Sequence, residues 1–350
     1  MKRADEGLAF LLQYEHVAWY EHGKVRILDR RVYPTEICFV ECKTYHEVIQ
    51  AIRDMVTQSA GPYTAVGMGM ALAAWEIRHG SIDEQLAFLK QASSDLANAR
   101  ITTANRYRII CDQCYDSAKS ALSHGQDPVE AIKLLTINSL NRRYETMEKV
   151  AAYLIQQIPD QGNVLTQCFG ETIIGMMCRI AKQTNKQIHF YCAETRPFFQ
   201  GARLTASVTV QMGFQTTVVS DNMIAYIMQN KGIDVFTSAA DTIARDGTIA
   251  NKIGTFQIAL LAKEFQIPYF VTGIPDTDKM AGSDIIIEER DPQQVLCYRG
   301  ILNTLPEVNA IYPSFDITPP SYISGVVTDR GIYSAYDLNT YFTQGPVSFY

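Results

Sequence analysis

The sequence lacks the features of several large protein classes. Its 350 residues carry 31 Lys and Arg against 37 Asp and Glu, so no basic surplus favours a nucleic-acid partner. It contains no run of about 18 apolar residues, the length that predicts a membrane span. The N-terminal segment MKRADEGLAFLLQYEH lacks the longer apolar core and the small-residue cleavage site of a signal peptide. We therefore expect a cytoplasmic protein with no membrane partner.

Common cofactor patterns are also absent. No GxGxxG follows the first strand of the C-terminal half, and no Walker-type phosphate loop occurs. The six histidines show no metal-ligand spacing, so we expect neither a metal nor another cofactor. Eight dispersed cysteines do not form a disulfide scaffold and fit a reducing compartment. Cys111 and Cys114 have the spacing of a redox motif, but they fall in a helical run without a second ligand pair.

The chain divides into two patterns, and Pro159-Asp160-Gln161-Gly162 is the best boundary between them. Residues 1–158 predict a small β meander followed by a helical bundle. The expected strands are 17–20, 25–29 and 36–41. The expected helices are 45–57, 62–79, 82–99, 103–123 and 128–157, the last with a possible break.

In residues 159–350, short apolar strands alternate with helices. This alternation is typical of βαβ units and predicts an α/β domain with a doubly wound, Rossmann-like parallel sheet. The expected strands are 164–168, 187–192, 215–220, 233–237, 269–273 and, with weaker support, 284–287.

Thr237–Thr255, TSAADTIARDGTIANKIGT, carries the densest set of polar groups. Asp241 follows the apolar strand, and Asn251-Lys252 precede a helix that begins at Gly254. Ligands of open α/β sheets bind at the carboxyl ends of strands, where helix N-termini attract anions. The set suits an anionic substrate that needs a proton donor or acceptor. The alternative is an ordinary strand–loop–helix connection with polar capping residues.

Further polar groups follow the other strands. Cys168 ends the first strand and faces a helix start, which can lower the pKa of a cysteine, although a buried small hydrophobe is the usual role. Arg196, Gln200 and Arg203 surround a glycine turn after the second strand and suit phosphate or sugar hydroxyls, unless they form a solvated loop. Several such loops at one sheet edge predict a binding site there.

Two segments resemble the 5-methylthioribose-1-phosphate isomerase family. ETRPFFQGARLTA, residues 194–206, resembles the family pattern ETRPxxQGxRLTA, and ADTIARDGTIANKIGT, residues 240–255, resembles ADxIAxNGxxANKIGT. The segments 287–292 and 313–319 match two further family segments, and the resemblance spans essentially the whole chain. Related folds occur in ribose-1,5-bisphosphate isomerases and in regulatory subunits of a translation-initiation exchange factor.

The resemblance implies aldose–ketose isomerisation of a ribose 1-phosphate whose 5-hydroxyl is missing or replaced. It implies Cys168 and Asp241 as catalytic groups. It implies further contacts with the phosphate or the sugar from Arg100, Gln200, Asn251, Lys252, Ser59, Ala60 and Gly61. Asp241 is the candidate acid for the ring oxygen, and hydrogen moves from C2 to C1 either by proton transfer at Cys168 or by direct hydride shift. A homodimer is also implied.

The sequence departs from the family pattern at two places. Ser59 stands where the family usually has a phosphate-binding arginine, and losing one charged contact costs roughly 1.5–3 kcal/mol unless another group compensates. Cys168-Phe-Gly-Glu171 replaces the usual CNAG. We therefore expect a diverged paralogue that acts on a smaller 5-substituent, as in 5-deoxyribose 1-phosphate, with Phe169, Phe198, Phe199 or Tyr63 filling the methylthio space. The alternative is a non-catalytic sugar-phosphate- or nucleotide-binding regulatory protein of the same fold.

Overall fold

The computed structural model describes residues 3–100, 104–345 and 349. The chain divides into two compact units between Glu145 and Thr146, which is a point inside helix α6 (Pro128–Ile155). The boundary expected between residues 158 and 159 falls in the turn that follows this helix. Among the described residues, no helix has the length and apolar character needed to cross a membrane.

A three-stranded antiparallel sheet opens the first unit. β1 (Ala18–Glu21) pairs with β2 (Lys24–Leu28), which pairs with β3 (Phe39–Cys42), and the predicted hairpin is confirmed. Its turn residues His22 and Gly23 both have positive φ, 47° and 77°. β3 begins at Phe39, later than predicted, because the amides of Thr35 and Glu36 close a turn on the Val32 carbonyl.

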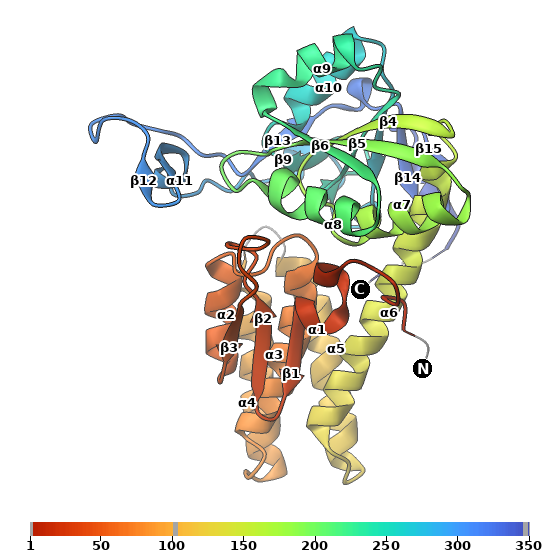
Figure 1. Cartoon of the computed structure of the whole chain (residues 1–350). Helices are drawn as coiled ribbons and strands as arrows, with labels where there is room; N and C mark the ends of the chain where they lie inside the picture. The colour runs from red at the N-terminus through yellow and green to blue at the C-terminus, as the bar shows by residue number, and fades with distance from the viewer. Residues whose placement is uncertain (1–2, 101–103, 346–348, 350) are drawn as a thin grey trace. The chain divides into compact units, whose positions relative to one another are not determined.

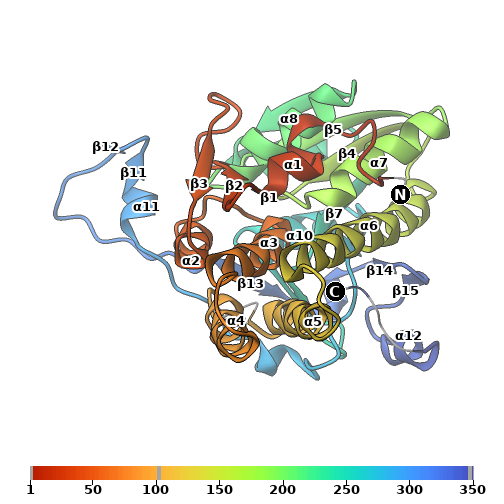
Figure 2. The same cartoon turned by 90° about the horizontal axis from the view of Figure 1, so that it is seen from below.

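Helix α3 (Gly61–Glu76) forms the centre of the first unit. All but its last two residues are buried, as its apolar sequence predicts, and Pro62 lies in its first turn. Figure 2 shows it between the β1–β3 sheet and helices α4 and α5. The helix α6 runs without the break that the sequence had suggested. The other helices of this unit are η1 (Phe10–Leu12), α1 (Tyr14–Val17), α2 (Tyr45–Arg53), α4 (Ile82–Ala97) and α5 (Ala104–Ser123).

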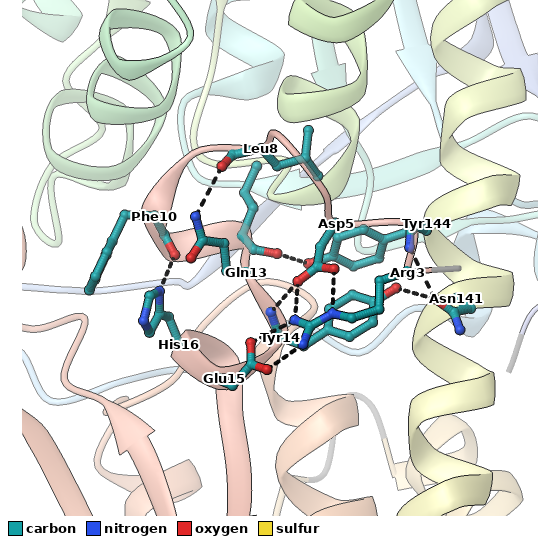
Figure 3. A network of polar contacts seen from close by, with 12 residues as sticks. Arg3, Asp5, Leu8, Phe10, Gln13, Tyr14, Glu15, His16, Asn141 and Tyr144 are labelled. Atoms are coloured by element: carbon teal, nitrogen blue, oxygen red, sulfur yellow. Dashed lines mark hydrogen bonds and ion pairs between the residues drawn. The ribbon is translucent and has the colours of Figure 1, made fainter. Parts of the chain in front are cut away.

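A buried polar network fixes the N-terminal segment on α6 (Figure 3). The Tyr14 hydroxyl donates to Asn141 Oδ1 at 2.6 Å, and the Tyr144 hydroxyl donates to the Leu12 carbonyl at 2.7 Å. Asp5 accepts from the Tyr14 amide at 2.8 Å and forms an ion pair with Arg3. The apolar patch of this segment is thus part of a folded core.

A seven-stranded sheet forms the second unit, in the order β15-β14-β10-β7-β4-β5-β6. All neighbours pair in parallel except β14 and β15. Figure 1 shows α7 and α8 on one face of this sheet and α9 and α10 on the other, which confirms the doubly wound α/β fold. The strands are β4 (Gln161–Thr166), β5 (Gln187–Ala193), β6 (Gln215–Val219), β7 (Val235–Ala239), β10 (Tyr269–Thr272), β14 (Gly325–Thr328) and β15 (Gly331–Tyr333). The helices are α7 (Thr172–Gln183), α8 (Ala206–Gln211), α9 (Ile224–Asn230) and α10 (Thr255–Glu264).

The predicted strand 284–287 is wrong. Residues Gly282–Asp284 form a short 3-10 turn, and the Asp284 carboxylate accepts from the amides of Met280 and Ala281. The chain then leaves the sheet as an arm, seen in Figure 1 at α11 (Gln293–Leu296) and β12 (Ile301–Leu302). A small sheet, β13-β9-β8, was not predicted; it consists of β8 (Thr242–Ile243), β9 (Ile249–Lys252) and β13 (Phe315–Thr318).

Candidate active site

Cys168 and Asp241 follow the two neighbouring strands between which the sheet changes its winding direction. β4 leads through α7 toward β5 on one side, whereas β7 leads through α10 toward β10 on the other. Thr166 of β4 pairs with Thr237 of β7, so the two candidate residues emerge at the same sheet edge. Open α/β sheets bind their ligands at this switch point.

The loop after β5 holds the backbone of Cys168 on both sides. The Cys168 amide donates to Thr195 Oγ1 at 3.0 Å, and the Cys168 carbonyl accepts from Thr205 Oγ1 at 2.6 Å. Thr195 in turn contacts Gln167 Oε1 at 3.2 Å, and its amide donates to Asp221 at 2.8 Å. Cys168 is therefore set in one orientation by residues of the segment 194–206.

The backbone of these two loops adopts conformations that residues with side chains rarely take. Cys168, Glu171, Thr195 and Phe199 have φ values of 61°, 43°, 65° and 56°. Left-handed conformations of non-glycine residues are uncommon and cost of order 1–3 kcal/mol each when sparsely populated. Such strain persists where surrounding contacts impose it, and it concentrates at functional sites.

Gly201 permits the close packing of the 194–206 loop on β5. A Cβ atom at this position would lie 1.8 Å from the Ala193 carbonyl oxygen, so only glycine fits. The chain continues as a π-helical turn, Gly201–Thr205, a feature frequent at functional sites. The preceding Gln200 is buried, and its Oε1 has no hydrogen-bond partner among the described residues. Its amide oxygen is thus available to a ligand hydroxyl.

Replacing Gly201 with alanine is expected to lower the free energy of unfolding by about 2–4 kcal/mol, because the new methyl group clashes with buried backbone. Urea titration of the purified variant measures this loss. Gly213→Ala is the matched control: Gly213 has φ 80°, but a Cβ there would meet nothing closer than 3.9 Å. Gly213→Ala should lower the free energy of unfolding by only about 1 kcal/mol, the cost of placing alanine in this backbone conformation. Equal losses in the two variants would show that the close contact does not matter.

Asn251 and Lys252 lie in strand β9, not in the loop that the sequence suggested. Both are buried, and Asn251 Nδ2 donates to Thr255 Oγ1 at 3.0 Å. The Lys252 ammonium lies 4.6 Å from the centre of the Phe315 ring on β13. The Asp241 amide also donates to the carbonyl of Ala250 on β9 at 2.9 Å. The small sheet therefore joins Asp241 to the Asn251–Lys252 pair.

Helix α10 begins beside these groups. Gly254, with φ 98°, caps the helix, and Gln167 Nε2 donates to the neighbouring Ile253 carbonyl at 3.0 Å. The Asp316 carboxylate accepts from the amides of Gly254 at 2.7 Å and Phe256 at 3.1 Å. Burial raises the pKa of Asp316 to about 6, against the effect of these hydrogen bonds and of Lys252. The start of α10 is therefore already occupied by a carboxylate.

The charges of several of these residues influence the pKa of the Cys168 thiol. Although part of the residue is accessible, burial raises the pKa of the thiol to about 11. The positive charge of Lys252 lowers this pKa, the carboxylate of Asp241 raises it, and Arg290 lowers it further. Cys168 is therefore a neutral thiol at pH 7 that faces one acid and two cations.

This raised pKa predicts how Cys168 reacts with iodoacetamide. Since the thiolate is the nucleophile, its alkylation rate in the ligand-free protein is expected to rise about tenfold per pH unit from pH 7 to 10. Peptide-resolved mass spectrometry separates Cys168 from the other seven cysteines. A rate that levels off below pH 9 would contradict the buried, neutral thiol.

Comparison with known proteins decides the family. Residues 62–335 match the Initiation factor 2 subunit family. The chain belongs to this family. It is 34% identical over 332 residues to the methylthioribose-1-phosphate isomerase of Carboxydothermus hydrogenoformans, covering 90% of this chain and 94% of that relative. The enzyme of the same name from Bacillus pumilus is 34% identical over 331 residues, with coverages of 90% and 92%.

Solved structures of this family share the fold. The 5-methylthioribose 1-phosphate isomerase of Pyrococcus horikoshii OT3 aligns with a TM-score of 0.79 and 30% identity, covering 94% of this chain and 96% of that one. The translation initiation factor eIF-2B subunit delta of A. fulgidus aligns with a TM-score of 0.76 and 27% identity, with coverages of 91% and 96%. The resemblance to the isomerases and the prediction that this family member is an isomerase are confirmed.

The remaining predicted contacts of this family member lie in its first unit. Ser59, exposed and with φ 58°, precedes α3, whose N-terminal residues are Ala60 at the cap and Gly61. Arg100 Nη2 lies 3.1 Å from the sulfur of Met55, at the start of the same turn region. The first unit thus contains all four candidates, and three of them are consecutive in the chain.

Sequence reasoning missed several groups that shape the site. Thr195 and Thr205 lie in the segment that carries the resemblance, so their hydroxyls could have been considered. Arg290 and Tyr312 lie in or beside the other matched segments, 287–292 and 313–319. The amide of Arg290 donates to the Tyr312 carbonyl at 2.9 Å, and its guanidinium lies 5.8 Å from the Phe198 ring. Their proximity to Cys168 depends on the path of the arm, which no local pattern predicts.

Proposed function

We propose that this protein converts a C5-modified ribose 1-phosphate into the corresponding ribulose 1-phosphate, with Cys168 and Asp241 as the reacting groups. One observation carries the proposal: the two residues leave adjacent parallel strands at the switch point of the sheet. The names of the relatives support it, since they are isomerases of methylthioribose 1-phosphate. Gln200, Asn251 and Lys252 then contact the sugar or its phosphate.

The chemistry needs a proton donor and a controlled transfer of hydrogen. Phosphate blocks the anomeric carbon, so Asp241 protonates the ring oxygen as the bond between C1 and that oxygen breaks. One hydrogen then moves from C2 to C1, and the proton of the C2 hydroxyl replaces the one that Asp241 gave. The sum leaves a C2 ketone, a C1 methylene and an unchanged enzyme.

Two routes satisfy this balance. In one, the Cys168 thiol first gives its proton to the Asp241 carboxylate, and the resulting thiolate removes the C2 proton and returns it to C1 through an enediol-like intermediate; Asp241 returns the thiol proton at the end of the cycle. In the other, C2 hydride shifts directly to C1 in a pocket from which water is excluded. Turnover in D₂O separates them: deuterium at C1 supports proton transfer, and its absence supports the hydride shift.

We propose further that the substrate has a small 5-substituent, as in 5-deoxyribose 1-phosphate. Aromatic side chains crowd the loops near Cys168 in the second unit. The rings of Phe198 and Tyr312 are 6.3 Å apart, those of Phe199 and Tyr298 are 5.2 Å apart, and Phe169 is buried beside Cys168. We infer that these rings leave room for a methyl group at C5 and too little for a methylthio group.

A side-by-side turnover assay tests both parts of the proposal. The substrates are 5-methylthioribose 1-phosphate, 5-deoxyribose 1-phosphate and ribose 1-phosphate. A higher kcat/KM for the 5-deoxy compound supports the smaller substituent, whereas a clear preference for the methylthio compound overturns it. If no sugar phosphate turns over, the alternative of a non-catalytic binding protein takes its place, an alternative favoured by the likeness to the A. fulgidus initiation factor subunit.

The broader setting is proposed from the same resemblance. We place the enzyme in salvage or disposal of S-adenosylmethionine-derived by-products in the cytoplasm, as a homodimer without metal or nucleotide cofactor and without a nucleic-acid partner. Light scattering after size-exclusion chromatography measures the oligomeric state. Dialysis against EDTA is expected to leave turnover unchanged.

A further inference from the structure

A hydroxyl of helix α10 fixes the orientation of the Asn251 side-chain amide. Asn251 Nδ2 lies 3.0 Å from Thr255 Oγ1, and the same hydroxyl oxygen lies 2.7 Å from the Lys252 carbonyl. A carbonyl oxygen only accepts, so the single hydrogen of the Thr255 hydroxyl is directed at Lys252. Toward Asn251 the hydroxyl can then only accept, and the amide must turn its NH2 group to Thr255.

Thr255 is itself held in place. It is the first residue of α10 and is 0% exposed. The Asp316 carboxylate accepts from the amides on either side of it, those of Gly254 at 2.7 Å and Phe256 at 3.1 Å. Asp316 is also the residue of β13 that lies opposite Asn251 on β9. The backbone that carries the hydroxyl is thus attached to the strand pair that carries the amide.

This orientation leaves the Asn251 amide oxygen as an acceptor without a partner. No hydrogen bond within the described part of the chain reaches Asn251 Oδ1, and the residue is 4% exposed. A nearly buried acceptor in this state costs free energy unless a ligand or water donates to it. The next residue of β9, Ala250, binds the amide of Asp241, which is partly exposed. A ligand that reaches Asp241 therefore also comes near Asn251.

Gln200 differs from Asn251 in this respect. Gln200 is 3% exposed, and its Oε1 has no partner among the residues that the structure describes. No side-chain hydrogen bond among these residues holds its amide, so either end can face a ligand. At Asn251 the Thr255 hydroxyl makes the choice. The Asn251 contact can therefore be assigned to one kind of chemical group.

We infer that Thr255 is a positioning residue, which makes Asn251 an acceptor for a sugar hydroxyl and not a contact for the phosphate. The inference rests on the proposed function for the identity of the sugar. A phosphate monoester is mostly a dianion at neutral pH, has no proton to donate and is repelled by an amide oxygen.

The chemistry of the proposed substrate identifies the hydroxyl. Before the ring opens, a C5-modified ribose 1-phosphate has two hydroxyl groups, at C2 and C3. The C2 hydroxyl loses its proton in the reaction and therefore stays with the reacting groups. The C3 hydroxyl is thus the donor that we assign to Asn251 Oδ1.

The experiment compares the preferred sugar phosphate with its 3-deoxy-3-fluoro analogue, in which fluorine has about the size of a hydroxyl but no proton to donate. The parent should show a kcat/KM about 10–100-fold lower for the fluoro compound, because two acceptors then face each other. Thr255→Val releases the amide, which can turn its NH2 group to either compound, so this ratio should fall at least about fivefold. Thr255→Ser keeps the hydroxyl and should restore the ratio.

Thr209→Val is the matched control. Thr209 is also a buried threonine of the second unit; its Oγ1 donates to the Ala206 carbonyl at 3.1 Å and accepts from Thr216 at 2.8 Å. Its replacement should leave the ratio at the value of the parent, because general damage lowers both rates together. The intrinsic effect of fluorine on the reaction is the same in every variant and cancels.

Three outcomes overturn the inference. One is a parent that uses the fluoro compound as well as the hydroxyl compound, a result that does not depend on how the variants fold. Another is a folded Thr255→Val enzyme that keeps the ratio of the parent; Thr255→Ala serves as the second variant without the hydroxyl. The third is a folded protein that binds neither compound, which overturns the proposed function as well. If the compounds bind without turnover, calorimetric dissociation constants give the same ratio, and its fall in Thr255→Val supports the inference although the proposed function fails.

Discussion

Replacing Cys168 with serine is expected to lower isomerase turnover by about 10²–10⁴-fold, the usual contribution of a positioned acid–base group. Serine keeps the size of the side chain, and the Thr195 and Thr205 hydroxyls bond only the backbone of residue 168, so the loop should keep its conformation. The hydroxyl, however, is a far weaker acid than a thiol. Initial-rate assays with the preferred sugar phosphate measure the loss, which should appear in kcat more than in KM.

Cys297→Ser is the control for this substitution. Cys297 is a partly exposed, free cysteine on the arm of the same unit. Its replacement should leave turnover within about twofold of the parent, as is usual for a surface change. A Cys168→Ser enzyme that retains more than a tenth of the parent's kcat, with an unchanged melting temperature, would remove Cys168 from the chemistry.

The sheet of the second unit could be predicted because most of its strands can be recognised from their own short sequences. β4, β5, β6, β7 and β10 are short runs bounded by turn residues, and helices lie between most of them. Because parallel strands end at the same edge of a sheet, this pattern also places Cys168 and Asp241 at one edge. β14 was missed because the four residues Gly325–Thr328 are short and come after an irregular arm rather than a helix.

Tertiary contacts explain the features of the structure that sequence patterns did not predict. The apolar run 284–287 resembles a strand, yet a carboxylate from Asp284 closes a turn at its start. The need for glycine at position 201 comes from a carbonyl eight residues earlier, seen only when the loop is packed on β5. The contacts of Arg30 with the α3 turn join residues that are 28 positions apart. Sequence patterns indicate local backbone geometry, whereas these features depend on contacts that form only when the chain is folded.

Asp241→Asn is the second change with a large expected effect. The amide has nearly the size of the carboxyl group but cannot protonate the ring oxygen, so turnover should fall by about 10²–10⁴-fold. The backbone of Asp241 is held by the Ala250 carbonyl, a contact that the substitution leaves in place. Since the carboxylate raises the pKa of Cys168, its removal should also speed alkylation of that thiol at a fixed pH.

These two readouts move in opposite directions, which separates a catalytic role from general damage. A disordered site would lose activity and expose several cysteines together, whereas the specific effect raises alkylation at Cys168 alone. Asp246→Asn is the matched control in the same loop: Asp246 is exposed and accepts from the Thr248 amide at 2.9 Å. Asp246→Asn should change turnover little and leave the alkylation rate of Cys168 unchanged. If Asp241→Asn behaved like this control, the ring oxygen would receive its proton from another group, and the Cys168–Asp241 pair would no longer define the site.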